Sequence, residues 1–203
     1  ETAAKHLSVV EAETSRLSRL IHNVLTFARQ QRDQLTVHLR KASLDDVTQR
    51  VVSVWRPGLE AKGFIVECEL SASQLFAFDP DAVEQIIGNL LSNVEKYAES
   101  GRFVRVSTTM NERDVRLIIE DRGPGIPSRM HAAVFAPFVR VRNDVTEGVS
   151  GTGIGLSISR DLAELLEGFL GLTAGAEEAA IVVPGRVIIG LETDGLAKMA
   201  VGQ

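Results

Sequence analysis

Asn89 and Asn93 lie one helical turn apart in the stretch NLLSNVEKY. At this spacing both amides project from one face of a helix, and each can direct its carbonyl oxygen at a hard cation such as Mg²⁺. Lys96 and Tyr97 follow on the next turn, where the lysine offers a positive charge to a polyphosphate. Mg²⁺ held by one or two protein oxygens completes its shell with phosphate oxygens and water. An ordinary amphipathic helix with exposed asparagines explains the same stretch, which alone leaves both interpretations open.

A tight turn, DRGPGIP, begins at Asp121 and follows a strand that alternation predicts for residues 115–120. Gly123 and Gly125 allow the backbone to approach a flat ligand closely. A carboxylate at the mouth of such a turn can accept a hydrogen bond from an exocyclic amine, which suits adenine. For this block in isolation, a plain strand-to-helix turn is the simpler interpretation.

A glycine-rich loop, GTGIG, opens an apolar helix. Backbone N–H groups at a helix N-terminus bind anions, and glycines allow a phosphate to come close. The dinucleotide-binding fingerprint requires a strand directly before such a loop. Residues 140–150 are instead polar, which predicts a flexible lid that nucleotide orders.

In their order, NLLSNVEKY, DRGPGIP, VFAPFVRV and GTGIGLSIS resemble the catalytic, ATP-binding domain of bacterial sensor histidine kinases. The resemblance covers roughly residues 10–170 and implies ATP and Mg²⁺ as cofactors. It makes Asn93 the principal Mg²⁺ ligand, supported by Asn89, and it assigns catalytic roles to Asn89, Lys96 and Arg140. The residues that it places around the nucleotide are Asn89, Asn93, Lys96, Tyr97, Asp121, Gly123, Gly125, Ile126, Arg140, Gly151, Thr152, Gly153, Ile154, Gly155 and Leu156.

By the same resemblance, Lys96 and Tyr97 line the phosphate and ribose side, and Asp121 recognises the adenine amine. Phe135 and Phe138 anchor the lid, and Arg140 approaches the terminal phosphate. The chain departs from the family at Arg122, at Val94, in its C-terminal stretch and in lacking a phosphoacceptor block. We expect the closing strands near residues 169–173 and 186–191.

The N-terminal segment carries an apolar heptad pattern, which predicts a helix of about thirty residues. Its positions are Leu7, Val10, Thr14, Leu17, Ile21, Val24 and Ala28. The extra apolar residues Leu20, Leu25 and Phe27 favour a four-helix bundle formed by a homodimer. RLSRLIHNVLTFAR resembles the second helix of the histidine kinase dimerisation hairpin, although a generic coiled coil has the same periodicity.

Residues 1–34 are therefore expected to form a partial dimerisation helix, and residues 35–203 the catalytic domain. Alternation predicts strands at 35–39 and 64–70, and Ser43 can cap a helix that Gly63 ends. Asp79 and Pro80 can begin the asparagine-bearing helix. The fold class is α+β: a long N-terminal helix, then an α/β sandwich with a mixed sheet and helices on one face. The resemblance implies a Bergerat-type ATP-binding fold.

The chain has 203 residues, 44% of them hydrophobic, which can bury one full core. A net charge of −5 argues against nucleic acid or an anionic membrane as the main partner. Cys68 is the only cysteine, which predicts a core thiol and a reducing compartment. No apolar run is long enough to cross a bilayer. We expect a cytoplasmic location for this fragment, with anchoring of a full-length protein in the inner membrane left open.

The resemblance favours an enzyme, a protein histidine kinase in two-component signalling that transfers the γ-phosphoryl group of Mg-ATP to histidine and serves a response regulator. A degenerate kinase that only binds nucleotide or docks a partner is the alternative, and the intact Asn93, Asp121 and GTGIG argue against it. Another ATPase or a serine kinase of the same superfamily is a third possibility. The heptad helix directly before the domain argues against that assignment.

The histidines are four: His6, His22, His38 and His131. HNVLT loosely resembles a phosphoacceptor pattern at His22. Asn23 replaces the acid that would take a proton from the imidazole, however, so general-base assistance is missing. We therefore expect the acceptor in a helix before Glu1, and we expect this chain to bind ATP without phosphorylating itself on histidine.

Overall fold

The computed structural model describes residues 35–111, 114–140, 152–170, 180–181 and 186–193, together with Thr14, Ile21, Leu25, Thr26 and Ala28. These five N-terminal residues are helical. The rest of the predicted dimerisation helix lies outside the described residues. Within the described part of the chain, none of the helices has the length and apolar character that a bilayer crossing requires.

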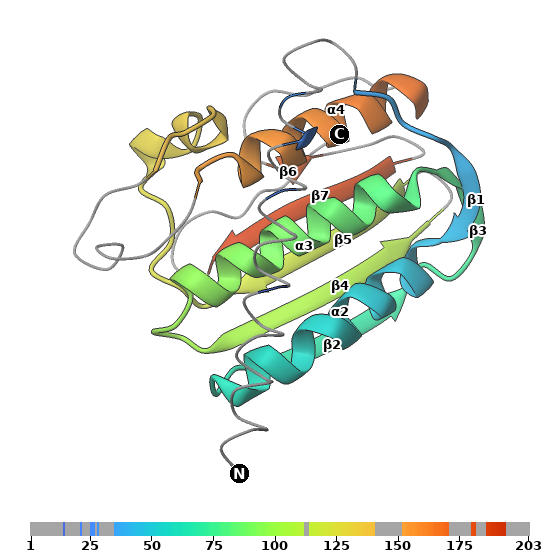
Figure 1. Ribbon diagram of the computed structural model, residues 1–203. Coiled ribbons are helices and arrows are strands. Elements are labelled where there is room, and N and C mark those ends of the chain that lie inside the picture. Colours follow the sequence, from blue (N-terminus) through green and yellow to red (C-terminus); the bar gives the residue numbers. More distant parts are fainter. Residues whose placement is uncertain are drawn as a thin grey trace.

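A mixed five-stranded sheet forms one layer of the fold, as the sequence predicts (Figure 1). Its order is β2 (Ile65–Ser71), β4 (Phe103–Met110), β5 (Asp114–Asp121), β7 (Arg186–Thr193) and β6 (Ala180–Ile181). β2 pairs parallel with β4 and β5 pairs parallel with β7, whereas the β4–β5 and β6–β7 pairs are antiparallel. β1 (Arg40–Ser43) and β3 (Leu75–Phe78) form a separate antiparallel pair.

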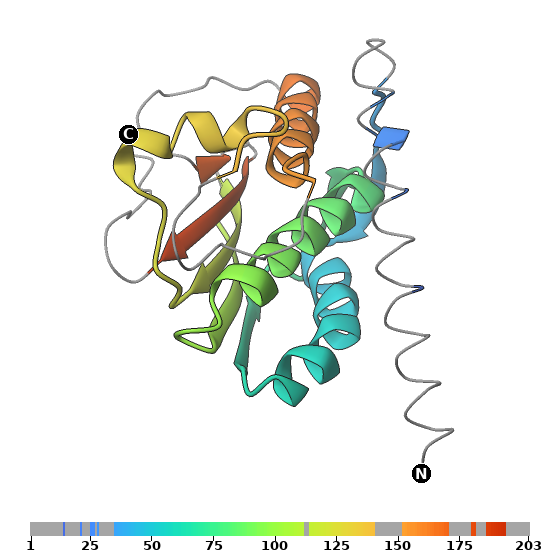
Figure 2. The same ribbon diagram turned by 60° about the vertical axis from the view of Figure 1, so that its left-hand side comes forward.

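Three helices cover one face of this sheet: α2 (Leu44–Ala61), α3 (Pro80–Tyr97) and α4 (Gly155–Leu170) (Figures 1 and 2). Ser43 caps α2, because its Oγ accepts a hydrogen bond from the Asp46 N–H at 3.2 Å. Asp79 caps α3 and Pro80 occupies its first turn, both as predicted. Two short 3₁₀ turns, η1 (Ser128–Met130) and η2 (Ala133–Phe135), lie between β5 and α4.

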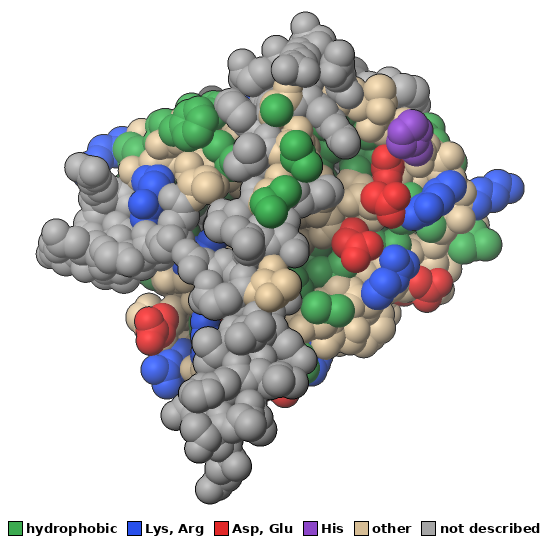
Figure 3. Space-filling view, viewed as in Figure 1, with side chains coloured by type: hydrophobic (Ala, Val, Ile, Leu, Met, Phe, Trp, Pro, Cys, Tyr) green, Lys and Arg blue, Asp and Glu red, His purple; other side chains and the backbone are tan. Residues whose placement is uncertain are grey.

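The core lies between the sheet and the helices. Alternate residues of β4 and β5 face the helices and are buried: Val104, Val106, Thr108, Val115, Leu117 and Ile119. The opposite face of the sheet carries charges. Arg105 lies between Glu67 and Glu120, with N–O distances of 2.9 and 3.6 Å. Over α2 and β1, acidic and basic side chains lie side by side on the surface (Figure 3). Such exposed ion pairs contribute little to stability.

The edge strand β2 is covered in part by a helix side chain. Arg56 of α2 directs its Nη1 at the Val66 carbonyl oxygen, 2.7 Å away. Cys68, on the same strand, is half-buried and packs against the core, as expected of a core thiol. Burial raises the pKa of this thiol.

The strand predicted at residues 35–39 is wrong. These residues form no regular element, and the strand β1 begins only at Arg40. The His38 N–H instead donates to Asp79 Oδ2 at 2.6 Å, so a side chain takes the bond that a ladder would have used. Of the strand predicted at residues 169–173, Phe169 and Leu170 instead complete α4, because the helical spacing of Leu162, Leu166 and Phe169 continues. Residues 171–173 lie outside the described residues. The last predicted strand agrees with β7.

A partly buried polar cluster joins α2 to the ends of β2 and β4. Both carboxylate oxygens of Asp45 lie 2.9 Å from the Ala72 N–H. The Thr108 hydroxyl donates to Asp45 Oδ1 and accepts from the Ser71 N–H at 3.0 Å. Because Thr108 is only 1% exposed, water cannot replace these partners.

Replacing Asp45 with Ala should therefore destabilise the fold by about 1.5–3 kcal/mol, since it leaves buried donors without their charged acceptor. Asp46→Ala is the matched control, because it removes a first-turn acid of the same helix from an exposed position. Chemical denaturation followed by circular dichroism measures both. Equal losses in the two variants would show that the helix dipole, and not the cluster, explains the effect.

Candidate functional site

α3 presents its two asparagines differently. The apolar side of the helix is buried against the sheet through Ile86, Ile87, Leu90, Leu91 and Val94. Asn93 is half-buried, as are Lys96 and Tyr97 in the last turn. Asn89 is only 8% exposed and packs toward α4. The interpretation of α3 as an ordinary helix with two exposed asparagines is therefore wrong for Asn89.

Asn89 fastens α3 to the start of α4. Its Nδ2 donates to the Gly155 carbonyl oxygen and to Ser159 Oγ, both at 3.2 Å. Gly155 is the first residue of α4, so this side chain contacts the glycine-rich block that the sequence places near the phosphates. The sequence had singled out Asn89 and Gly155 but had missed Ser159. A serine at a core position of an apolar helix was the signal available.

The turn after β5 packs on the end of α3. The Gly123 N–H donates to Asp121 Oδ1 at 2.7 Å. A Cβ on Gly123 would lie 2.7 Å from that oxygen and 3.2 Å from the Tyr97 carbonyl oxygen, so a side chain does not fit there. Gly125 has a φ of +71°, which favours glycine. The predicted adenine turn and the last turn of α3 are thus in direct contact.

Asp121 is a buried carboxylate, 9% exposed. Burial raises its pKa because the charged form is desolvated, and the hydrogen bond from the Gly123 N–H opposes this only in part. A carboxylate whose solvation is incomplete is well suited to accept a hydrogen bond from a bound ligand.

A backbone hydrogen bond joins the two ends of the predicted lid. The Phe138 N–H donates to the Gly153 carbonyl oxygen at 2.9 Å. Gly153 has a φ of +70°, and a Cβ there would lie 3.0 Å from the Phe138 Cα. Phe138 is 65% exposed, so the contact with Gly153 is made by its backbone. Residues 141–151, including Gly151, lie outside the described residues.

The remaining predicted site residues surround these contacts. Ile126 lies beside the turn, where its carbonyl oxygen is 2.8 Å from His131 Nε2. Ile154 is buried and Leu156 packs against the core, so both side chains anchor the glycine-rich loop on the core. Thr152 and Arg140 are exposed at the two ends of the lid.

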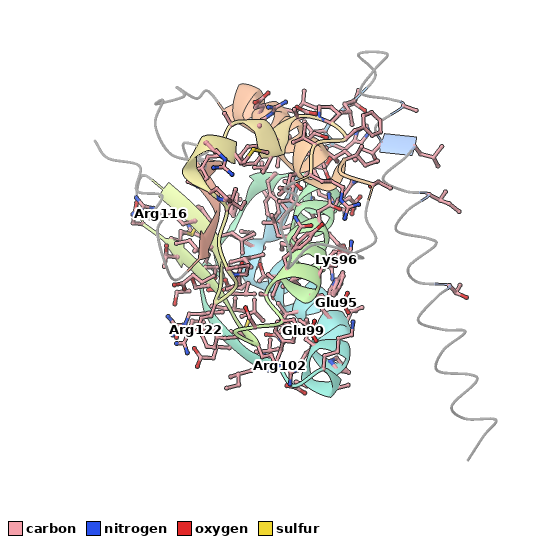
Figure 4. The ribbon with its side chains drawn as sticks, turned by 90° about the vertical axis from the view of Figure 1, so that its left-hand side faces the viewer. Glu95, Lys96, Glu99, Arg102, Arg116 and Arg122 are labelled. Carbon is pink, nitrogen blue, oxygen red and sulfur yellow. The ribbon has the colours of Figure 1, made fainter. Side chains whose placement is uncertain are left out.

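The position of Arg122 explains why the chain can depart from the family pattern at this residue. Its guanidinium lies 4.1 Å from the centroid of the Phe103 ring. Arg122 lies on the side of the sheet away from the helices, whereas Lys96 lies on the helix side (Figure 4). The residue after Asp121 therefore points away from the site. The loop before β4 also packs closely here, because a Cβ on Gly101 would overlap the Arg122 carbonyl oxygen.

Comparisons with known proteins find similar sequences and similar folds. The family model for histidine kinase-, DNA gyrase B- and HSP90-like ATPases matches residues 78–186. The two-component system protein A of Emericella nidulans is 28% identical over 179 residues, which is 84% of this chain and 26% of that protein. The sensor histidine kinase TmoS of Ectopseudomonas mendocina is 27% identical over 170 residues, 83% of this chain and 18% of that protein. This chain thus spans about a quarter or less of these two relatives.

A solved structure of full-length ShkA in complex with AMPPNP superposes with a TM-score of 0.62 at 26% identity. The match covers 74% of this chain and 31% of that one.

Asp121→Asn tests the electrostatics of the turn. Asparagine keeps an acceptor for the Gly123 N–H and removes the buried charge. Because the folded-state pKa is raised, the unfolded chain loses this proton at lower pH than the folded chain, so wild-type stability falls as pH rises through the folded pKa. The variant should be more stable than wild type at pH 8, and the difference should vanish below about pH 4.

Urea denaturation across this pH range measures the effect, with the exposed carboxylate of Glu99 replaced by Gln as control. A pH-independent difference for Asp121→Asn would show that its charge does not oppose folding.

Proposed function

Because this chain belongs to the histidine kinase-, DNA gyrase B- and HSP90-like ATPase family, we propose that it is the ATP-binding catalytic region of a sensor histidine kinase. The observation that carries the proposal is that the four predicted ligand blocks contact one another, two of them through α3. Gly123 packs on the Tyr97 carbonyl, Asn89 binds Gly155, and Gly153 is tied to Phe138.

The residues fit the nucleotide from its base to its phosphates. Asp121 accepts a hydrogen bond from the adenine amine, with Gly123, Gly125 and Ile126 shaping the turn around the ring. Lys96 and Tyr97 serve the phosphate and ribose side. The start of α4 offers backbone N–H groups to the phosphates, since the first N–H groups of a helix have no partner within it.

Asn93, with Asn89 in support, is the proposed holder of Mg²⁺. The donor set fits this ion, because amide oxygens are hard, neutral ligands and Mg²⁺ prefers oxygen. When bound, Mg²⁺ would neutralise charge on the phosphates. Asn93 is half-buried and lies between Asn89 and Lys96 on the same side of α3. Its amide would therefore lie between the side chains that we propose to face the phosphates.

The reaction that we propose is transfer of the γ-phosphoryl group of ATP to a histidine nitrogen. The bond from the γ-phosphorus to the bridging oxygen breaks and a phosphorus–nitrogen bond forms, while ADP leaves. Phosphoryl transfer needs mainly positioning and charge stabilisation. Lys96 and Arg140 supply positive charge, and the lid excludes water. A response regulator would then receive the phosphoryl group.

None of the four histidines of this chain is the proposed acceptor. The His131 ring is engaged with the Ile126 carbonyl oxygen through Nε2. His38 lies in the connection before β1, where its N–H is bound to Asp79. His22 lacks a following acid, and neither His22 nor His6 is among the described residues. The N-terminal helix is the proposed homodimer contact, and Ile21 and Leu25 on it are each 53% exposed.

Asn93→Ala should weaken binding of AMPPNP in Mg²⁺ by tenfold or more, about 1.4 kcal/mol, because it removes a cation ligand. Alanine is the better helix former, so α3 remains intact. Ser92→Ala is the control on the same helix and should bind as wild type. Calorimetry measures both. Unchanged affinity in Asn93→Ala would remove Asn93 from the site.

Incubation with γ-labelled ATP should place no acid-labile phosphate on this chain, because its histidines lack the acid that assists transfer. The label is measured after parallel acid and base treatment. Acid-labile phosphate that disappears in a His22→Gln variant would make the N-terminal helix the substrate and contradict the proposal on the acceptor.

A further inference from the structure

Asn89 has a contact pattern that a metal ligand does not require. Its amide lies 3.2 Å from two atoms of α4, the Gly155 carbonyl oxygen and Ser159 Oγ. A carbonyl oxygen can only accept, so the Asn89 group that faces Gly155 must be the NH₂. These bonds fix the plane of the amide and hence the direction of its oxygen.

The partner of this amide, Ser159, is 1% exposed. Its neighbours in the core, Ile158, Leu162 and Ala163, are apolar. Apolar packing tolerates small sliding of one helix on another, whereas a hydrogen bond has a narrow range of distance and angle. The bonds from Asn89 therefore set the axial position of α4 against α3 more closely than apolar packing alone.

That position matters at the first turn of α4. The Ile158 N–H is bound to the Ile154 carbonyl oxygen at 3.1 Å, so the helical ladder starts there. The preceding N–H groups, at residues 155–157, have no carbonyl one turn earlier within the helix. Asn89 holds the carbonyl of the first of these residues, and thereby orients the peptide groups around it.

We propose that Asn89 and Ser159 form a positioning pair, which holds the start of α4 in the orientation that binds a polyphosphate and presets the Asn89 amide beside it. This inference rests on the proposed function and specifies how Asn89 supports Asn93. Ser159 touches no nucleotide in this scheme. It acts through Asn89.

Ser159→Ala tests the pair, with Thr48→Ala as the control that also removes a buried hydroxyl. Thr48 is 0% exposed on α2, outside the residues proposed to bind the nucleotide, and its Oγ1 has no hydrogen-bond partner among the described residues. Ser159→Ala should weaken AMPPNP binding about two- to tenfold, the range for loss of one hydrogen bond. Thr48→Ala should change it by less than about twofold.

The affinity for adenosine distinguishes a loss of α4 positioning from general damage to the nucleotide site. It lacks phosphates, so Ser159→Ala should leave its affinity unchanged in a competition assay. An equal loss for adenosine and AMPPNP would overturn the proposal, because it would mean that the whole site is disturbed. In an Asn89→Ala background, Ser159→Ala should have no further effect, since the pair is already broken. A full effect in that background would show that Ser159 acts independently and would also overturn the proposal.

Replacing Asn89 or Asn93 with Asp tests whether Asn89 acts as a hydrogen-bond donor and Asn93 as a cation ligand. A carboxylate cannot donate to Gly155 but remains a good Mg²⁺ ligand. In Mg²⁺, AMPPNP binding to Asn89→Asp should be at least about tenfold weaker than to Asn93→Asp. Equal affinities would contradict the positioning role of Asn89. Circular dichroism checks folding, and if Asn89→Asp does not fold, the Ser159→Ala arm decides.

The outcomes distinguish this inference from the proposed function. Wild-type protein that binds no AMPPNP would refute the proposed function itself. Wild-type binding that depends on Asn93 but is equally insensitive to Ser159→Ala and Thr48→Ala would refute only the pair.

Discussion

The Asp79 carboxylate is the interaction on which the placement of α3, and therefore of the site, depends. It is 5% exposed and accepts the N–H groups of Asp81 and Ala82 through one oxygen and that of His38 through the other. The helix start is thus fixed in position and in rotation, and it is tied to the segment that leads in from the N-terminal helix. Once the rotation of α3 is fixed, its apolar side enters the core, Asn89 faces α4, and the Tyr97 carbonyl faces the turn after β5.

Around this helix, the site is built by close backbone approach more than by side chains. Gly123 leaves room for the Asp121 carboxylate and the Tyr97 carbonyl, and Gly153 leaves room for Phe138. The arrangement includes a charge that opposes folding, since Asp121 is buried and burial raises its pKa. Such a charge is consistent with the role in recognition that we propose for Asp121, because proteins commonly give up stability at functional sites.

Much of this could be predicted from local pattern. Ser43 and Asp79 cap helix starts through bonds to residues two or three positions away, and Pro80 suits a first helical turn through its fixed φ, so their effects are visible in sequence. The failures are non-local. The strand expected at residues 35–39 did not form because Asp79, distant in sequence, takes the His38 N–H. β3 was missed because only its pairing with β1 makes it a strand. Asn89 was singled out by its spacing from Asn93, but its two bonds to α4 depend on helix packing that no spacing rule reveals.

The Arg56 side chain that covers Val66 has a consequence for how copies of the protein meet. β2 is an edge strand of the described sheet, and an uncovered edge invites pairing with a strand of another molecule. The guanidinium occupies one of the carbonyl oxygens that such pairing would need, and brings a positive charge to the edge. Wherever a second copy is held nearby at high local concentration, sheet-to-sheet extension is thereby disfavoured, and contact between copies is directed to other surfaces.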